Sequence, residues 1–331
     1  MLKYLAPALC LLAAPALAQG LSIKKMDPAL DSVIAPGAKI EKVATGFIFT
    51  EGPMWKDGKL WFSDVRGDKV RTFEPKAGDP AGGKVTVILK DSGGMKDAPP
   101  SCNFGSNAMI TDKDGSILLT RMAIGTIERM DDKGGLKPFL SKYEGKRFNS
   151  PNDLLFTADG ALWFTDPSFG LPKMDADPAK QLKYNAVWRY AGGKLTPVIT
   201  DMTQPNGIGF SPDGKTLYVS NSMPDMYLRA YDVGADGKLS NPRTVIKYPG
   251  SAPDVPDGLK VDSAGNIWST GPGGVRIISP KGKVLGQLVI PEIVANVGFA
   301  EDGKTVYLTG STSLYRLHSK IAGEIPMYYR K

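Results

Sequence analysis

A repeated hairpin signal is the feature that most limits how this sequence can fold. Six short Gly-containing pairs each separate two apolar runs, and they recur at intervals of about 40 to 60 residues. Glycine tolerates the positive φ of a tight turn, so Asp-Gly between apolar runs predicts a β-hairpin. The six pairs are Asp57-Gly58, Asp114-Gly115, Asp159-Gly160, Asp213-Gly214, Ala264-Gly265 and Asp302-Gly303.

Each turn is followed by an apolar strand that ends on similar residues, and further strands follow it. Four antiparallel strands per unit are typical of the blades of a β-propeller. The sixth unit lacks a fourth strand, and residues 40–45 have the right character to supply it, which would pair the two ends of the chain and leave no open edge there. We therefore predict an all-β fold with one domain over 36–331, a six-bladed β-propeller of four-stranded blades closed by an N-terminal strand. An irregular leader is expected over 19–35.

The first residues predict export. Lys3 is followed by an apolar run over 5–18, and Ala16-Leu17-Ala18 is a small-x-small cleavage signal. The run is too short to span a bilayer. We predict a signal peptide over 1–18 and a periplasmic or secreted protein. A membrane anchor is the alternative for this segment, and we find no other candidate span.

The mature chain holds one cysteine, Cys102, so an intramolecular disulfide is excluded and stability has to come from packing. The single histidine, His318, falls in the third strand of the last unit, where a structural role is expected. The formal net charge is +7, but the basic residues are dispersed and form no nucleic-acid footprint. The sequence does not indicate an oligomeric state.

Every first strand of the six units begins with an oxygen-bearing side chain, here called a head residue. In a propeller the first strands line the central channel, so the heads are expected to converge at one mouth. Asn and Asp also occur at turns because they bond their own backbone, but six equivalent positions favour a common site. The head residues are Glu51, Asn107, Asn152, Asn206, Asp257 and Asn296.

Convergent oxygens without nearby sulfur or imidazole suit a hard cation. We expect one divalent metal cation, with Ca²⁺ as the first choice and Mg²⁺, Mn²⁺ or Zn²⁺ as alternatives. A zinc site of the usual His/Cys kind is excluded, because His318 and Cys102 lie in different repeats.

Five motifs in order resemble the gluconolactonase branch of the SMP-30/gluconolactonase/LRE-like family, over roughly residues 40–318. The motifs are Glu51-Gly52-Pro53-x-Trp55, the run 143–153, Thr165-Asp166-Pro167, Pro205-Asn206-Gly207 and Pro256-Asp257-Gly258-Leu259. The resemblance implies a six-bladed propeller that acts on lactones with one catalytic divalent metal. The implied ligands are Glu51, Asn152, Asn206 and Asp257. At the position of Asn107, relatives contact substrate or metal-bound water.

The expected chemistry is metal-assisted hydrolysis of a small-molecule lactone by an activated water. Asp257 is our choice for the catalytic general base. Second strands run back to the same mouth, so their ends are expected to surround the pocket. The predicted substrate-binding residues are Asn107, Arg121, Met122, Asp166, Asn221 and Asn296.

One departure from the family affects the substrate. Many bacterial relatives carry Glu-His-Gly where this chain has Arg121-Met122-Ala123. The pocket histidine is therefore missing. Two alternatives to a sugar lactonase remain: an aryl-ester, organophosphate or non-sugar cyclic ester hydrolase on the same scaffold, and a propeller that binds a ligand without catalysis.

Overall fold

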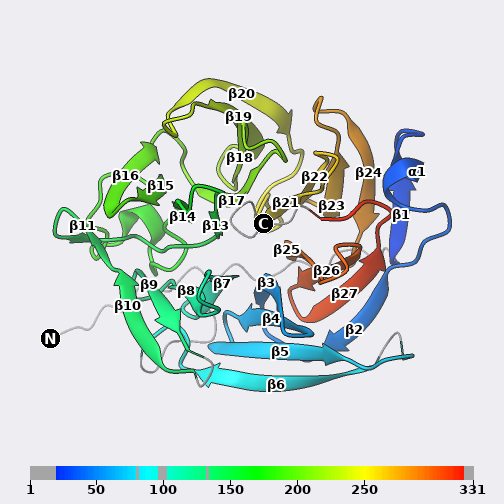
Figure 1. The fold of residues 1–331 in the computed structure, drawn as a ribbon, viewed down its shortest axis with the longest axis horizontal. Coiled ribbons are helices and arrows are strands. Elements are labelled where there is room, and N and C mark those ends of the chain that lie inside the picture. The colour runs from blue at the N-terminus through cyan, green and yellow to red at the C-terminus, as the bar shows by residue number, and fades with distance from the viewer. Residues whose placement is uncertain (1–19, 80–81, 96–102, 132–133, 324–331) are drawn as a thin grey trace, which may run out of the picture.

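A computed structural model describes residues 20–79, 82–95, 103–131 and 134–323. Six antiparallel sheets stand around a central axis like the blades of a propeller, as predicted (Figure 1). No helix in these residues has the length and apolar character needed to cross a membrane. The predicted signal peptide over 1–18 and Cys102 lie outside the described residues.

Each blade has its first strand at the axis and its fourth at the rim. A small hairpin, β11 (Lys142–Tyr143) and β12 (Lys146–Arg147), and one 3₁₀ turn, η1 (Met174–Ala176), lie outside the blades. Blade 1 consists of β3 (Thr50–Lys56), β4 (Lys59–Asp64), β5 (Lys69–Pro75) and β6 (Gly83–Lys90), and blade 2 of β7 (Ser106–Thr111), β8 (Ile117–Arg121), β9 (Thr126–Met130) and β10 (Leu136–Leu140). Blade 3 consists of β13 (Leu154–Phe156), β14 (Leu162–Asp166), β15 (Ala186–Ala191) and β16 (Lys194–Ile199), and blade 4 of β17 (Pro205–Phe210), β18 (Thr216–Asn221), β19 (Tyr227–Val233) and β20 (Leu239–Lys247). Blade 5 consists of β21 (Leu259–Val261), β22 (Ile267–Gly271), β23 (Gly274–Ile278) and β24 (Val284–Val289), and blade 6 contains β25 (Val294–Phe299), β26 (Thr305–Gly310) and β27 (Ser313–His318).

The ring closes as the sequence predicted. Strand β2 (Glu41–Thr45) pairs antiparallel with β27 and becomes the fourth strand of blade 6. Arg316 and Glu41 form an ion pair across this junction at 2.8 Å. Pairing the two ends of the ring removes two open sheet edges that would otherwise attract other chains.

The segment before β2 is more regular than predicted. Strand β1 (Ser22–Lys25) adds a fifth strand to the rim of blade 5 by pairing with β24. A single helical turn, α1 (Leu30–Val33), then buries Leu30 and Val33 between blades 5 and 6. The prediction of an irregular leader over 19–35 is therefore wrong for these elements, because they cover apolar side chains that the blades leave at their outer edge.

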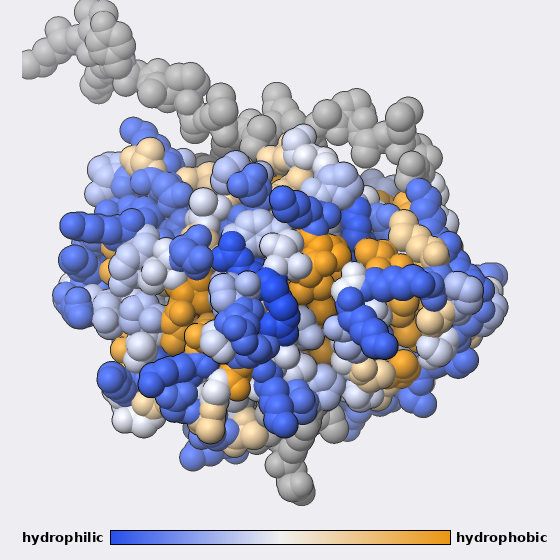
Figure 2. Space-filling view, turned by 90° about the horizontal axis from the view of Figure 1, so that it is seen from above, coloured by the Kyte–Doolittle hydropathy of each residue, from blue (hydrophilic) through white to orange (hydrophobic). Residues whose placement is uncertain are grey.

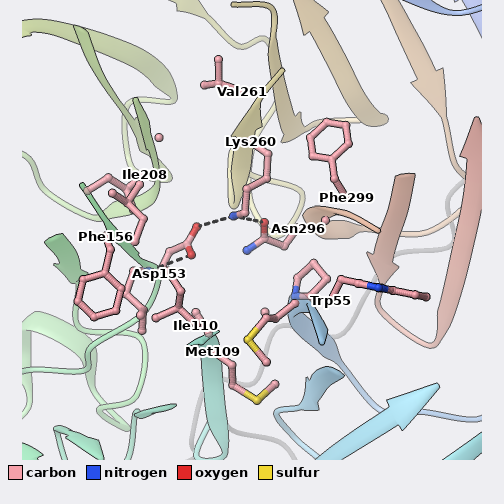
Figure 3. Close-up of a pocket in the computed structure, with 18 of the residues that line it drawn as sticks. Trp55, Met109, Ile110, Asp153, Phe156, Ile208, Lys260, Val261, Asn296 and Phe299 are labelled. Carbon is pink, nitrogen blue, oxygen red and sulfur yellow. Dashed lines mark hydrogen bonds and ion pairs between the residues drawn. The ribbon is translucent and has the colours of Figure 1, made fainter. Parts of the chain in front are cut away.

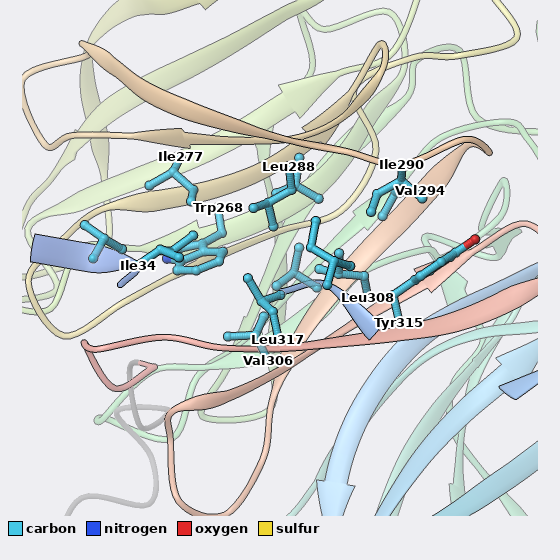
Figure 4. Packing of buried hydrophobic residues seen from close by; sticks show 14 of the residues in the cluster. Ile34, Trp268, Ile277, Leu288, Ile290, Val294, Val306, Leu308, Tyr315 and Leu317 are labelled. Atoms are coloured by element: carbon cyan, nitrogen blue, oxygen red, sulfur yellow. The ribbon is translucent and has the colours of Figure 1, made fainter. Parts of the chain in front are cut away.

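Packing between neighbouring blades supplies the core. Six clusters of buried apolar side chains lie among the described residues, one at each junction between blades. At the junction of blades 5 and 6, Trp268 packs with Leu308 and Tyr315 (Figure 4). Fully burying one such side chain stabilises the fold by about 1.5–3 kcal/mol, so six clusters explain how the ring holds without a disulfide. The rim carries mostly hydrophilic side chains, with apolar strips between them (Figure 2).

Candidate active site

The six head residues meet at one end of the inner strands, as the sequence predicted. Asn296 Nδ2 donates to Glu51 Oε2 at 3.0 Å, which links blade 6 to blade 1. The carboxyl of Asp257 lies close enough to Glu51 and Asn206 for both to act on its pKa. Asn107 Nδ2 points at the sulfur of Met122 at 3.4 Å. The contacts therefore join residues from four of the six blades into one constellation, with Asn107 of blade 2 and Asn152 of blade 3 beside them.

The inner strands leave regular pairing where they carry a head. The register of β3 against β4 shifts between Glu51 and Met54, and β7, β17 and β25 shift at the equivalent places. Such a bulge re-aims a side chain that would otherwise face the neighbouring blade.

Glycines after the heads let neighbouring blades approach closely. Gly52 has φ +59°, and a β-carbon there would lie 2.2 Å from the carbonyl oxygen of Asn107. A β-carbon on Gly258 would lie 2.0 Å from the amide carbon of Asn296. Any larger residue would push the heads of adjacent blades apart, which explains why Gly follows Glu51 and Asp257.

Five of the heads each keep one buried side-chain oxygen that no protein group satisfies. A buried polar atom without a partner costs roughly 1–3 kcal/mol, so five at one place require an explanation. The sixth head, Asn296, is different because its Oδ1 accepts from Lys260 Nζ and from the Val297 backbone. The five atoms are Glu51 Oε1, Asn107 Oδ1, Asn152 Oδ1, Asn206 Oδ1 and Asp257 Oδ1.

The two acidic heads are electrostatically strained. Burial, reinforced by the charge of Asp153, raises the pKa of Glu51 to about 7. The hydrogen bond from Asn296 acts in the opposite direction but is the weaker effect. Burial and the charge of Glu51 hold the pKa of Asp257 well above its usual range. A positive charge among the heads would relieve both effects, since it favours the ionised carboxylates.

A row of hydroxyls that we did not predict fixes the backbone of the heads. Ser63 Oγ donates to the carbonyl of Asn107 at 2.7 Å, Thr120 Oγ1 to that of Asn152 at 3.0 Å, and Ser220 Oγ to that of Asp257 at 2.6 Å. Each hydroxyl therefore bonds the head of the next blade. The signal was present in the sequence, because the fourth residue of every second-strand motif is Ser or Thr: Ser63, Thr120, Thr165, Ser220, Thr270 and Thr309.

Two predicted substrate-binding residues brace the backbone instead. Asp166 is fully buried and accepts from the backbone of Asn149 at 3.0 Å and of Ser150 at 2.6 Å. Asn221 is equally buried and accepts from Gln204 N at 2.9 Å. The substrate-binding prediction is corrected for both, because their polar atoms are committed to the loops that lead into heads of their own blades.

Arg121 is also held away from the heads. Its guanidinium bonds Glu128 at 2.8 Å and the backbone carbonyls of Ser92 and Asp91 at 2.8 and 3.1 Å. We correct its predicted role from substrate binding to joining blade 2 with the loop after blade 1. Met122, in contrast, lies against Asn107 as expected for a pocket residue.

A cavity of about 270 Å³ lies further along the inner strands, beyond the heads. Its walls are mostly apolar and include Trp55, Phe156 and Phe299 (Figure 3). Of the six heads only Asn296 lines it. At the end of the cavity near the heads, Lys260 Nζ lies 3.5 Å from Asp153 Oδ2 and 3.4 Å from Asn296 Oδ1.

The heads fit a hard cation better than any other cofactor. Among the described residues, no three His, Cys, Asp or Glu side chains gather into a metal-binding group. The unsatisfied oxygens come instead from two carboxylates and three amides, a donor set suited to Ca²⁺ or Mg²⁺.

Comparisons with known proteins agree with this fold. A model of the SMP-30/Gluconolactonase/LRE-like region matches residues 49–312. Gluconolactonase of Zymomonas mobilis is 34% identical over 319 residues, which cover 91% of this chain and 87% of the relative. Pentonolactonase XacC of Haloferax volcanii is 27% identical and covers 78% of this chain and 80% of the relative. The structure of XC5397, a gluconolactonase of Xanthomonas campestris, superposes with a TM-score of 0.75 at 29% identity, covering 90% of this chain and 94% of that one.

The molecule is a six-bladed propeller with an oxygen-rich constellation at one end of its inner strands. It belongs to the SMP-30/gluconolactonase/LRE-like family, as the motifs predicted. It is a hydrolase that acts on the ester bond of small-molecule lactones.

Proposed function

We propose that the chain hydrolyses a sugar lactone with the help of one divalent cation held by Glu51, Asn152, Asn206 and Asp257. The observation that carries the proposal is the set of buried, unsatisfied oxygens on these four residues. The relatives named gluconolactonase and pentonolactonase support aldonolactones as the substrate class. Ca²⁺ is the first choice of cation, because amide and carboxylate oxygens in a flexible set suit its coordination.

When bound, the cation supplies an electrophile for the lactone carbonyl and makes a nearby water more acidic. Asp257 is the proposed general base. Its backbone N–H donates to Thr270 Oγ1 at 3.1 Å, and its carbonyl accepts from Gly207 N at 3.1 Å, so the residue is fixed on both sides. Its carboxylate takes the proton of the attacking water as the water oxygen bonds the carbonyl carbon. The ring C–O bond then breaks, and the proton passes to the leaving alkoxide.

Asn107 and Met122 are the proposed contacts for the body of the substrate. Both are buried: Asn107 lies on the inner strand of blade 2, and Met122 directly follows its second strand. Asn107 offers an unsatisfied amide oxygen to a ring hydroxyl, whereas the thioether of Met122 is a weak acceptor in a largely apolar side chain. This pair favours a lactone with one polar and one less polar edge.

The test is a pH-stat assay of gluconolactone, other aldonolactones and phenyl acetate, each with and without EDTA. We expect EDTA-sensitive hydrolysis of at least one aldonolactone, restored by Ca²⁺ in excess. Hydrolysis of phenyl acetate alone would support the aryl-esterase alternative. Full aldonolactone turnover in EDTA after exhaustive dialysis would contradict the role of the cation, and no hydrolysis of any ester would support a binding protein.

We further propose that residues 1–18 direct the chain to the periplasm or out of the cell. The apolar run and the Ala16-Leu17-Ala18 signal support this. N-terminal sequencing of the protein from a periplasmic extract is expected to begin at Gln19. A mature protein that retains Met1 in the cytoplasmic fraction would contradict export.

A further inference from the structure

Lys260 brings a positive charge to within 3.4 Å of the head residue Asn296, and its position has consequences for the cation site. It sits on inner strand β21, three residues after Asp257, where an apolar side chain would normally face the axis. Its side chain is 31% exposed and crosses to the other inner strands. Figure 3 shows the ammonium between Asp153 and Asn296, at the boundary between the heads and the cavity.

The ammonium of Lys260 fixes the orientation of the side-chain amide of Asn296. Lys260 Nζ and the Val297 backbone both donate to Asn296 Oδ1, at 3.4 and 2.8 Å. The amide nitrogen of Asn296 is therefore left to donate to Glu51 Oε2. This explains why Asn296 alone among the six heads presents no unsatisfied oxygen, and why one oxygen of Glu51 is occupied while the other is free.

The ammonium also balances charge. Glu51, Asp257 and Asp153 act on one another electrostatically, and Lys260 acts on Glu51 with the opposite sign. When ionised, the three carboxylates and one ammonium leave a net charge of about two negatives, which is what one divalent cation neutralises. Without the ammonium, the same cation would leave one negative charge in a buried site.

We propose that Lys260 is a built-in counter-ion that stabilises the cation-free site and weakens its hold on the divalent cation. The inference rests on the proposed function, because it concerns the same cation site. When the site is empty, the ammonium offsets part of the repulsion between the carboxylates. When a cation binds, the two positive charges repel each other across a partly buried region, so affinity is lower than the carboxylates alone would give.

The proposal makes two linked predictions for the variant Lys260→Met, which keeps the stem and removes the charge. The cation-free protein should lose stability, with a larger fall of Tm in EDTA than in saturating Ca²⁺. The Kd for Ca²⁺, measured by titration calorimetry, should fall by about tenfold, since a nearby positive charge has gone. A purely structural lysine would lower stability equally in both conditions and would not tighten cation binding.

Three further variants separate charge from packing. Asp153→Asn, which keeps the shape of Asp153 but leaves Lys260 unbalanced, should weaken Ca²⁺ binding by a similar factor. The double variant Asp153→Asn/Lys260→Met restores the net charge and should bind nearly as the parent does. Lys238→Met is the matched control, because the side chain of Lys238 is 88% exposed and pairs with Asp236, which is not a head residue. It should change neither quantity.

Each outcome is decisive. A parent protein that binds Ca²⁺ while Lys260→Met binds it equally or more weakly overturns the counter-ion role and leaves the proposed function standing. A parent protein that binds none of Ca²⁺, Mg²⁺, Mn²⁺ or Zn²⁺ overturns the cation site and the counter-ion role together. Tighter binding by Lys260→Met, with weaker binding by Asp153→Asn, supports the proposal.

Discussion

Asp166 Oδ1 accepts a hydrogen bond from the backbone of Ser150 at 2.6 Å, and this contact fixes the segment that delivers Asn152. The same arrangement recurs in two other blades. Asp64, at the end of β4, accepts from the backbone of Ile48 and Phe49 ahead of Glu51. Asn221, at the end of β18, accepts from Gln204 ahead of Asn206. In these three blades, the last residue of the second strand therefore sets the position of the head of its own blade.

The first prediction concerns Asp166 and pH. Burial raises the pKa of Asp166 from 3.8 to about 6, despite backbone hydrogen bonds and the charge of Arg147. The folded protein therefore holds this proton more tightly than the unfolded chain, and stability falls as pH rises from about 4 to about 6, then levels off. The change is about 3 kcal/mol for this one group.

Asp166→Asn should remove that slope. The variant is less stable than the parent overall, because an amide nitrogen meets backbone N–H groups that need acceptors. Urea unfolding at a series of pH values gives the difference between parent and variant, in which the contributions of Glu51 and Asp257 cancel. Identical slopes for the two proteins between pH 4 and pH 6 would rule out Asp166 as the titrating group.

The second prediction concerns the general base. Asp257→Asn keeps the shape and the backbone contacts of the residue but cannot accept a proton. We expect kcat to fall by at least about 10³-fold at saturating Ca²⁺, with an unchanged circular dichroism spectrum. Asp254→Asn, a neighbouring carboxylate on the same loop, is the control and should retain activity. Near-normal kcat in Asp257→Asn would remove this residue from the mechanism.

The third prediction tests the corrected role of Arg121. Arg121→Met leaves Glu128 buried without its partner, so the free energy of unfolding should fall by about 3 kcal/mol. The KM for a carboxylated lactone should not change relative to gluconolactone. The double variant Arg121→Met/Glu128→Met should recover much of the stability. A selective rise in KM for the carboxylated substrate would return Arg121 to the binding site.

The fourth prediction concerns the missing histidine. Met122→His places a hydrogen-bonding ring beside Asn107, so kcat/KM for polyhydroxylated lactones should rise relative to that for apolar lactones, by about tenfold. Met122→Leu, which keeps an apolar side chain of similar volume, is the control and should leave the ratio near that of the parent. A substrate ratio in Met122→His equal to the control would show that the side chain does not touch the substrate.

The repeat made most of the fold predictable. Glycine at the hairpin turns and β-branched or aromatic residues in the second strands are local signals, so the apolar strands expected after Gly115 and Gly265 are found as β8 and β22. Strand β1 was missed because Ser22–Lys25 shows no alternating apolar pattern, and it is stabilised by the edge of β24, which lies far away in the sequence.

The site was predictable to the level of residue type and blade position. The positions of the heads follow from the repeat, but the partners of the surrounding groups do not. Arg121 looked free because its acceptors, Ser92 and Asp91, lie some thirty residues away in a different blade. Lys260 was missed because a single lysine between Leu259 and Val261 carries no local signal of a charge partner in blade 3.

The strand that closes the ring also dictates when folding can finish. Glu41 and Arg316 are 275 residues apart in the sequence. A ribosome makes β2 before blade 1, yet its partner β27 appears only after the first five blades. Until then blade 6 is unfinished and β2 has no sheet to join, and closing so long a loop is slow. The ring can therefore be completed only after β27 has been made: a chain that terminates before β27 keeps an open sheet edge that proteases and chaperones can recognise.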